Sequence, residues 1–171
     1  DAKPENYYSY SKVLADNSII YHSKKINCTS IRMPNCIGGI QYKNYLIPSL
    51  IDQIKDKKQN NILIKNGKTK RNFVDIRDFC RFIIFLYKFK KKIYPIINFC
   101  SNKNYSIAFL ARIIKKTFRS NKTILADTKK IKKSNYNFKP FLIKKIRFNF
   151  KFNIEETINY LYKNYERQKN K

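Results

Sequence analysis

The chain has 171 residues, with 38 Lys and Arg against 11 Asp and Glu, so its formal net charge is +27 at pH 7. Hydrophobic residues make up 43% of the chain and aromatic residues 15%, which is enough apolar material to bury a core and excludes wholesale disorder. The sequence holds no long apolar run, no leader-like start and no cysteine or histidine spacing that suits a metal, so we expect no membrane span, no secretory leader and no zinc site.

Hydrophobic periodicity predicts two helices and three strands in the first half of the chain. In chain order these are a helix over 9–22, a strand over 27–33, a helix over 46–57 and strands over 61–65 and 71–76. Pro34 ends the first strand. Asn66-Gly67 is a turn pair, and it predicts that the last two strands form a hairpin.

The second half predicts three more helices and two more strands. In chain order these are a helix after Asp78, a strand over 94–100, a helix after Ser106, a strand over 123–126 and a helix over 155–165. Asp78 and Ser106 are the expected N-caps of their helices. Residues 129–151 are basic and poorly patterned. The alternation of strands and helices predicts an α/β fold.

The basic charge comes mainly from lysine, which supplies 30 of the 38 basic residues. Lys, Ile and Asn are all abundant and share A/T-rich codons, whereas recognition of phosphates or bases would favour clustered Arg. We therefore expect only non-specific nucleic-acid binding. A catalytically dead basic module that binds nucleic acid or another polyanion is the alternative. The four scattered cysteines favour reduced thiols and a cytoplasmic location.

The pattern Tyr-x-x-x-Lys occurs four times. On a helix it places an ammonium beside a phenol and favours the ionised phenol, which can then act as a general acid or base. Only Tyr8/Lys12 follows a proline-bearing entry and leads through one helix into a strand. We interpret the other pairs as solvated helix faces; they are Tyr21/Lys25, Tyr87/Lys91 and Tyr165/Lys169.

Several motifs follow Tyr8/Lys12 in a definite order. They are Arg32-x-x-Asn35-x-x-Gly38, Leu46-Ile-Pro48, Gly67-x-x-x-Arg71 running on to Asp78, Asn98 followed by Tyr105-Ser-Ile107, and 152–157. In order and spacing the chain resembles the extended short-chain dehydrogenase/reductase family of NAD-dependent nucleotide-sugar epimerases and dehydratases. The resemblance implies the last part of a Rossmann-like parallel sheet plus a small α/β substrate-binding domain.

The resemblance also implies site residues. Tyr8 would be the catalytic acid or base, Lys12 would bind the nicotinamide ribose beside it, and Pro34 would lie against the nicotinamide of NAD or NADP. The substrate, a nucleotide-diphosphate sugar, would be bound by Asn35, Leu46 and Arg71, with the Arg71 guanidinium on the diphosphate. From the residues alone, Arg71 also fits a solvated basic face and Asn35 a turn former.

Four other polar or reactive residues have structural interpretations. Asp78 is expected to be a helix cap rather than a catalyst, and Arg32 a structural partner rather than a ligand. Cys36 and Cys100 are expected to be small core residues rather than nucleophiles.

The family's first half binds the dinucleotide pyrophosphate with a Gly-x-x-Gly-x-x-Gly turn, and this chain has only three glycines. We therefore expect the C-terminal portion of such an enzyme, inactive as an isolated chain. Residues 1–40 would end the NAD-binding domain and 41–171 would form the substrate domain, with 72–100 returning to the Rossmann sheet. The full-length enzyme would be a homodimer; a split enzyme, whose first half is a separate polypeptide, is a further possibility.

Overall fold

The computed structural model describes residues 4–39, 41, 44–89, 93–127 and 139–169. Helices and strands alternate through these ranges. The helices are α1 Tyr7–His22, α2 Leu46–Lys55, α3 Ile76–Lys88, α4 Ile107–Thr117, α5 Phe141–Lys145 and α6 Ile154–Lys169. The strands are β1 Ser30–Arg32, β2 Asn35–Ile37, β3 Asn61–Ile64, β4 Lys70–Asp75, β5 Ile96–Asn98, β6 Asn104–Ser106 and β7 Thr123–Ala126. The predicted α/β fold is confirmed.

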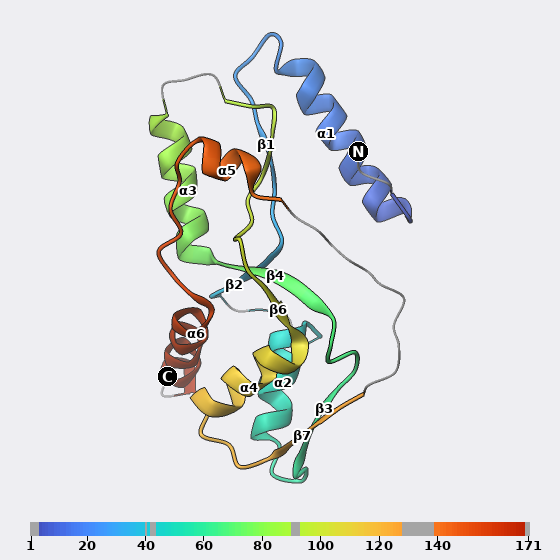
Figure 1. Ribbon diagram of the computed structural model, residues 1–171, viewed down its shortest axis with the longest axis vertical. Helices are drawn as coiled ribbons and strands as arrows, with labels where there is room; N and C mark the ends of the chain where they lie inside the picture. The colour runs from blue at the N-terminus through green and yellow to red at the C-terminus, as the bar shows by residue number, and fades with distance from the viewer. Residues whose placement is uncertain (1–3, 40, 42–43, 90–92, 128–138, 170–171) are drawn as a thin grey trace.

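The strands form three small sheets among the described residues. β1 pairs in parallel with β5, and β3 pairs in parallel with β7. β4 is the central strand of the third sheet, parallel to β2 on one edge and antiparallel to β6 on the other. In Figure 1 it crosses the middle of the molecule, between the elements drawn above it and those drawn below it.

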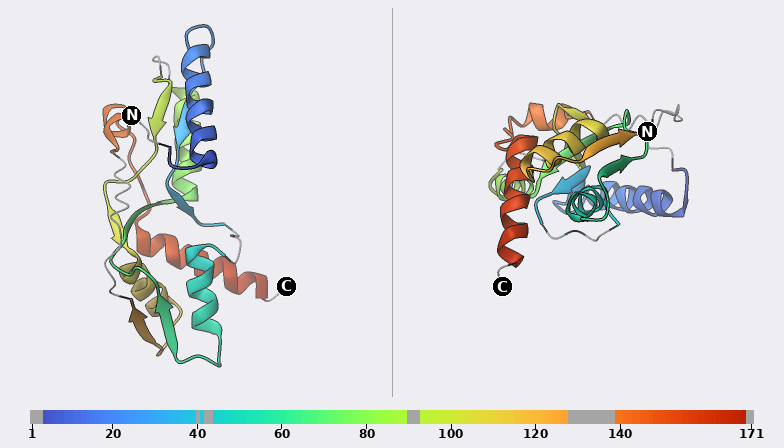
Figure 2. Two further views of the ribbon diagram at one scale, coloured as in Figure 1. Left: turned by 90° about the vertical axis from the view of Figure 1, so that its right-hand side faces the viewer. Right: turned by 90° about the horizontal axis from the view of Figure 1, so that it is seen from below.

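The core has two parts, one at each end of β4. The upper end holds α1, β1, α3, β5 and α5, and the lower end holds α2, β3, α4 and β7 (Figures 1 and 2). Aromatic residues dominate the upper cluster: Phe82, Phe99 and Phe148 are all buried there. Aliphatic residues dominate the lower cluster, to which α6 contributes Ile154, Ile158 and Leu161. The domain boundaries given above stay a prediction.

The predicted hairpin between 61–65 and 71–76 is wrong. The turn itself is present, because Asn66 adopts a left-handed φ of 62° and its carbonyl accepts from the amide of Thr69 at 2.9 Å. The two strands then diverge. β3 buries Ile62 and Ile64 beneath α2 and α4 and pairs with β7, whereas β4 crosses to the other sheet.

The predicted N-cap of α3 is also wrong. The helix begins at Ile76, and Asp75 is its N-cap, accepting a hydrogen bond from the amide of Arg77. The predicted cap of α4 is confirmed, because the Ser106 hydroxyl accepts from the amide of Phe109 at 3.1 Å. Three short elements escaped prediction, namely β2, β6 and α5.

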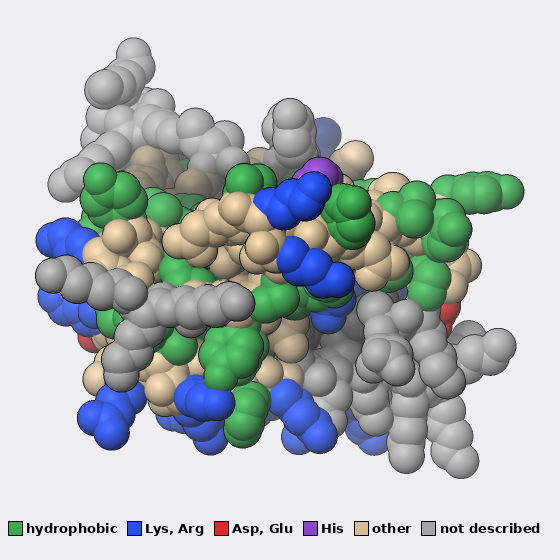
Figure 3. All heavy atoms as spheres, turned by 90° about the horizontal axis from the view of Figure 1, so that it is seen from above, with side chains coloured by type: hydrophobic (Ala, Val, Ile, Leu, Met, Phe, Trp, Pro, Cys, Tyr) green, Lys and Arg blue, Asp and Glu red, His purple; other side chains and the backbone are tan. Residues whose placement is uncertain are grey.

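In the described part of the chain, no helix combines the length and the apolar character needed to cross a membrane. Figure 3 views the molecule from above. On that face Lys and Arg side chains are scattered among hydrophobic ones and few acidic side chains are visible, as the net charge of +27 leads one to expect.

Candidate functional site

Tyr8 and Lys12 lie one turn apart on the same side of α1. The Lys12 ammonium is 5.1 Å from the centroid of the Tyr8 ring, and 72% of Tyr8 is exposed. Both side chains are therefore accessible to a ligand. Of the other Tyr-x-x-x-Lys pairs, Tyr21/Lys25 is solvated as predicted. Lys91 and the side chain of Lys169 lie outside the described residues.

Asp16 fixes this helix face to the sheet, and sequence reasoning missed it. Its carboxylate accepts from the Ser30 hydroxyl at 2.5 Å and from the Arg32 guanidinium at 2.7 Å. It is the buried residue of α1, only 8% exposed. Because Asp16 follows Lys12 by four residues, as Lys12 follows Tyr8, all three share one face. The four-residue spacing is the signal that could have revealed it.

Arg32 is a structural partner, as predicted, through its ion pair with Asp16. It ends β1, so the residues that follow leave the sheet at the carboxyl end of that strand. Pro34 comes next and is half-buried, and Asn35 opens β2 with an exposed side chain. The Asn35 amide donates to the Asn72 carbonyl at 3.0 Å, which places Asn35 beside β4, one residue from Arg71.

Leu46 and Arg71 line one cavity of about 630 Å³. The cavity lies between α2 and the segment from β3 to β4, and Ile107 from the start of α4 also lines it. Arg71 is half-buried in β4, opposite Tyr105 of β6. The structure thus brings two predicted substrate residues, 25 positions apart in the sequence, to the same cavity.

Asn72 holds β4 in place beside this cavity. Its side-chain amide donates to the carbonyls of Ser101 and Lys103 at 2.9 and 3.0 Å, and its oxygen accepts from the Ser101 amide at 3.1 Å. Asn72 is only 2% exposed, so these hydrogen bonds satisfy a buried side chain. They fix the backbone on which Arg71 is carried.

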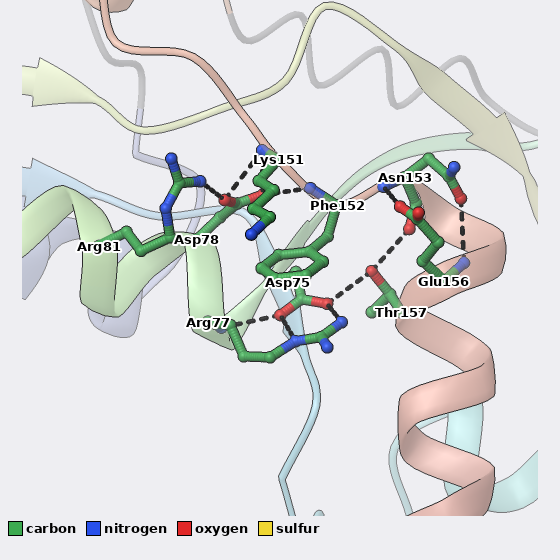
Figure 4. A network of polar contacts seen from close by, with 9 residues as sticks. All are labelled: Asp75, Arg77, Asp78, Arg81, Lys151, Phe152, Asn153, Glu156 and Thr157. Atoms are coloured by element: carbon green, nitrogen blue, oxygen red, sulfur yellow. Dashed lines mark hydrogen bonds and ion pairs between the residues drawn. The ribbon is translucent and has the colours of Figure 1, made fainter.

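Two buried carboxylates join β4 and α3 to α6 (Figure 4). Asp75 accepts from the Arg77 guanidinium at 2.7 and 2.9 Å and from the Thr157 hydroxyl at 2.8 Å. Asp78 accepts from the backbone amides of Lys151 and Phe152 and pairs with Arg81. Asp78 is therefore not the helix cap that we predicted, but it does have a structural role, as we expected.

Burial would raise the pKa of Asp75, but the hydrogen bonds from Arg77 and Thr157 outweigh it and the pKa lies below its ordinary value. An ionised Asp75 therefore stabilises the fold at neutral pH, and this stabilisation is lost as the pH falls through the folded-state pKa. We expect urea unfolding between about pH 7 and pH 3 to show a falling free energy of unfolding. Asp75→Asn should lower that free energy at pH 7 and flatten its decline in acid. An identical acid slope in both proteins would contradict this assignment.

The cysteines of the upper core are not poised to react. Burial, and then the charge of Asp75, raises the pKa of the Cys36 thiol to about 11, and burial raises that of Cys100 to about 11. Because the thiolate is the nucleophilic form, both thiols are inert at neutral pH. The interpretation of Cys36 and Cys100 as small core residues is confirmed.

Two of the three glycines have packing roles. Gly38 has a φ of +128°, and a Cβ there would lie 2.5 Å from Ile76. A Cβ on Gly67 would lie 2.9 Å from the Cβ of Ala126. These glycines admit neighbouring side chains and do not form a loop that could receive a phosphate. No group of three or more His, Cys, Asp or Glu side chains that could hold a metal occurs among the described residues.

Residues 1–100 match the model of the NAD dependent epimerase/dehydratase family. A curated relative, GDP-6-deoxy-D-talose 4-dehydrogenase from Aggregatibacter actinomycetemcomitans, is 29% identical over 107 residues, which are 61% of this chain and 35% of the relative.

Solved structures share the fold. RMD from Pseudomonas aeruginosa, complexed with NADPH, has a TM-score of 0.84 and 18% identity, covering 98% of this chain and 59% of that one. A GDP-L-fucose synthetase from Naegleria fowleri bound to NADP has a TM-score of 0.77 and 22% identity, covering 96% and 56%. UDP-glucuronic acid 4-epimerase from Bacillus cereus, in complex with UDP-glucuronic acid and NAD, has a TM-score of 0.76 and 16% identity, covering 98% and 55%. The chain therefore spans between a third and three fifths of the length of these proteins.

Proposed function

This chain belongs to the NAD dependent epimerase/dehydratase family, and from that premise we propose that it forms the substrate-binding part of a cytoplasmic enzyme acting on a nucleotide-diphosphate sugar. The observation that carries the proposal is the cavity of about 630 Å³ that Leu46 and Arg71 share. Its size is that of a small-molecule site. The names of the matched relative, a dehydrogenase of a GDP-sugar, and of one matched structure, an epimerase of a UDP-sugar, support the same substrate class.

Each predicted substrate residue has a role that its position allows. The Arg71 guanidinium is a planar donor suited to a diphosphate, and the Asn72 hydrogen bonds hold its strand in place. Leu46 opens α2 and offers an apolar wall with main-chain groups beside it. Asn35 keeps its side-chain oxygen available to accept from a sugar hydroxyl, and the second hydrogen of its amide nitrogen can donate to a phosphate, because the hydrogen bond to Asn72 uses one N–H.

The residues present fit the nicotinamide end of NAD or NADP. Tyr8 and Lys12 are exposed side by side, and Pro34 follows the strand to which their helix is anchored. The described residues offer no glycine turn for the pyrophosphate, because neighbouring side chains occupy the space beside Gly38 and Gly67. We propose that this chain holds the cofactor by Tyr8, Lys12 and Pro34 only.

The bound cofactor would supply a hydride acceptor next to the sugar. In this arrangement the Tyr8 phenolate oxygen accepts the proton of the sugar hydroxyl, or its phenol returns one to a keto oxygen. The Lys12 ammonium lies over the Tyr8 ring, 5.1 Å from its centroid, in a position to bind the nicotinamide ribose beside the phenol. Asp16 anchors the helix that carries both groups to β1, through Ser30 and Arg32.

We also propose that the full-length enzyme is a homodimer that pairs through α1. Tyr7, Tyr10, Leu14 and Tyr21 recur at helical spacing on the face opposite Tyr8, Lys12 and Asp16, and between 51% and 95% of each is exposed. Pairing would cover these side chains without blocking the site. Leu14→Asp should convert a dimer to a monomer in sedimentation equilibrium, because it places a charge in an apolar interface. If the full-length enzyme without the substitution sediments as a monomer, the proposed dimer is refuted.

The proposed function is tested by titrating UDP-glucose, dTDP-glucose and GDP-mannose into the chain at about 0.15 M salt, with heat as the readout. We expect one of them to bind saturably. Arg71→Ala should weaken that binding at least tenfold, since a charge-assisted hydrogen bond to the diphosphate contributes about 1.5–3 kcal/mol.

Lys70→Ala is the matched control. Lys70 precedes Arg71 in β4 and is exposed, so its loss removes the same charge without changing the cavity lining. We expect nearly unchanged binding in this variant. Equal losses in both variants, or binding of a random DNA duplex but of no nucleotide-sugar, would overturn the proposal in favour of the basic-module alternative.

A further inference from the structure

A second cavity, of about 720 Å³, lies apart from the one that contains Arg71. The two cavities have no lining residue in common. The second is bounded by the end of β4, by the loop between β5 and β6, and by the segment from α5 to the start of α6. Phe73, Val74 and Thr157 are buried residues of its wall. Its volume is in the range of small-molecule sites.

The charges around this cavity are almost all of one sign. Four basic side chains from three separate segments line it: Lys103 from the β5–β6 loop, Lys144 and Arg147 from α5 and its end, and Lys151 from the approach to α6. Among the described lining residues Asp75 is the one carboxylate, and its oxygens are already bound by Arg77 and Thr157. The four cations therefore have no anionic partner within the cavity wall.

None of the ion pairs found among the described residues involves these four cations. Asp78 lies close to Lys151, but it accepts from the backbone amide of that residue and pairs with the Arg81 guanidinium. Cations that converge on a concave surface repel one another, and an anion between them relieves that repulsion. Neutral donors, among them the side chains of Asn102 and Asn149, line the same space and can bind phosphate oxygens.

We propose that this second cavity binds a small molecule that carries two or more phosphate groups. Several cations spaced around a hollow match a ligand with several negative charges better than a single phosphate. The aromatic side chains nearby are already packed against the protein: Phe152 lies under the Arg77 guanidinium, at 3.6 Å, and Tyr105 stacks on Phe109. Recognition therefore rests on the phosphates and not on stacking of a base.

The probe is sodium tripolyphosphate, titrated into the chain at about 0.15 M salt with heat and thermal unfolding as readouts. We expect saturable binding and a rise in Tm. The double variant Lys144→Gln and Arg147→Gln should weaken binding at least tenfold. Its substitutions lie at exposed positions, and circular dichroism would verify that the fold is kept.

A second basic cluster lies at the end of α4 and provides a matched control. It consists of Arg112, Lys115, Lys116 and Arg119. Arg119 follows α4 with a left-handed φ of 51°, as Arg147 follows α5 with a φ of 60°. Lys116→Gln with Arg119→Gln therefore removes the same two charges from the same type of helix end. We expect binding within twofold of the original protein. Equal weakening by both double variants would show that only net charge matters and would overturn the proposal.

Two further comparisons separate this site from other sources of binding. Arg71→Ala removes the phosphate donor of the other cavity and should leave a saturable tripolyphosphate site that Lys144→Gln with Arg147→Gln still weakens; loss of all saturable binding in that variant would assign the phosphates to the nucleotide-sugar site instead. A single-stranded oligonucleotide should bind more weakly than tripolyphosphate and should be insensitive to Lys144→Gln with Arg147→Gln. Preferential binding of the oligonucleotide would replace a small-molecule site with a nucleic-acid surface.

Discussion

Asp78→Ala is expected to lower the free energy of unfolding by about 3–5 kcal/mol, measured by urea unfolding at neutral pH. The carboxylate is fully buried and accepts from the amides of Lys151 and Phe152 at 3.0 Å each. Removing it leaves the partly buried backbone amides of Lys151 and Phe152 without this acceptor and deprives Arg81 of its ion pair. The segment between α5 and α6 would lose its attachment to α3.

Arg81→Ala distinguishes the contribution of the ion pair from that of the backbone hydrogen bonds. The Arg81 side chain is 43% exposed, so its pair with Asp78 is partly screened and its loss should cost about 1 kcal/mol or less. Asp78→Asn keeps the volume and one acceptor and should fall between the two alanine variants. If Arg81→Ala cost as much as Asp78→Ala, the ion pair and not the amides would be the main attachment.

Local signals in the sequence predicted the longer elements because those elements repeat their pattern over several turns or several residues. Ser106 caps α4 as predicted, and β7 has the predicted bounds. β2 and β6 have three residues each and, unlike the equally short β1 and β5, do not lie within a longer stretch with a visible strand pattern. The supposed hairpin failed for a different reason. The Asn66 turn depends on neighbouring residues only. The pairing of β3 with β7 and of β4 with β2 and β6 depends on how side chains distant in the sequence are buried together.

The site shows the same division between local and distant information. Motif order was enough to propose Leu46 and Arg71 together, and they do line one cavity. The supporting residues Asp16, Asn72 and Asp75 escaped because a buried polar side chain has no pattern of its own. Whether such a side chain stabilises the fold depends on hydrogen-bond partners such as Arg32, Ser101 and Thr157, which only the fold brings within reach.

Asp16→Ala is expected to loosen α1 selectively. Along this helix Asp16 is the buried residue, and its bonds to Ser30 and Arg32 are the polar contacts that join the face of Tyr8 and Lys12 to β1. Hydrogen bonds to a charged group contribute about 1.5–3 kcal/mol, which corresponds to about 10- to 100-fold faster local opening. Amide hydrogen exchange over 7–22 should accelerate by that factor, while exchange in α3 and α4 stays unchanged.

Asp52→Ala is the matched control, because Asp52 is an exposed carboxylate on α2 and its loss should leave exchange in both helices nearly unaltered. Uniform acceleration across the molecule after Asp16→Ala would instead mean that α1 supports the whole fold. Selective acceleration has a functional consequence. A tyrosine and a lysine on a helix that opens more often spend less time anchored beside β1, so the proton transfer that we propose for this pair would depend on a carboxylate that we do not place in contact with the substrate.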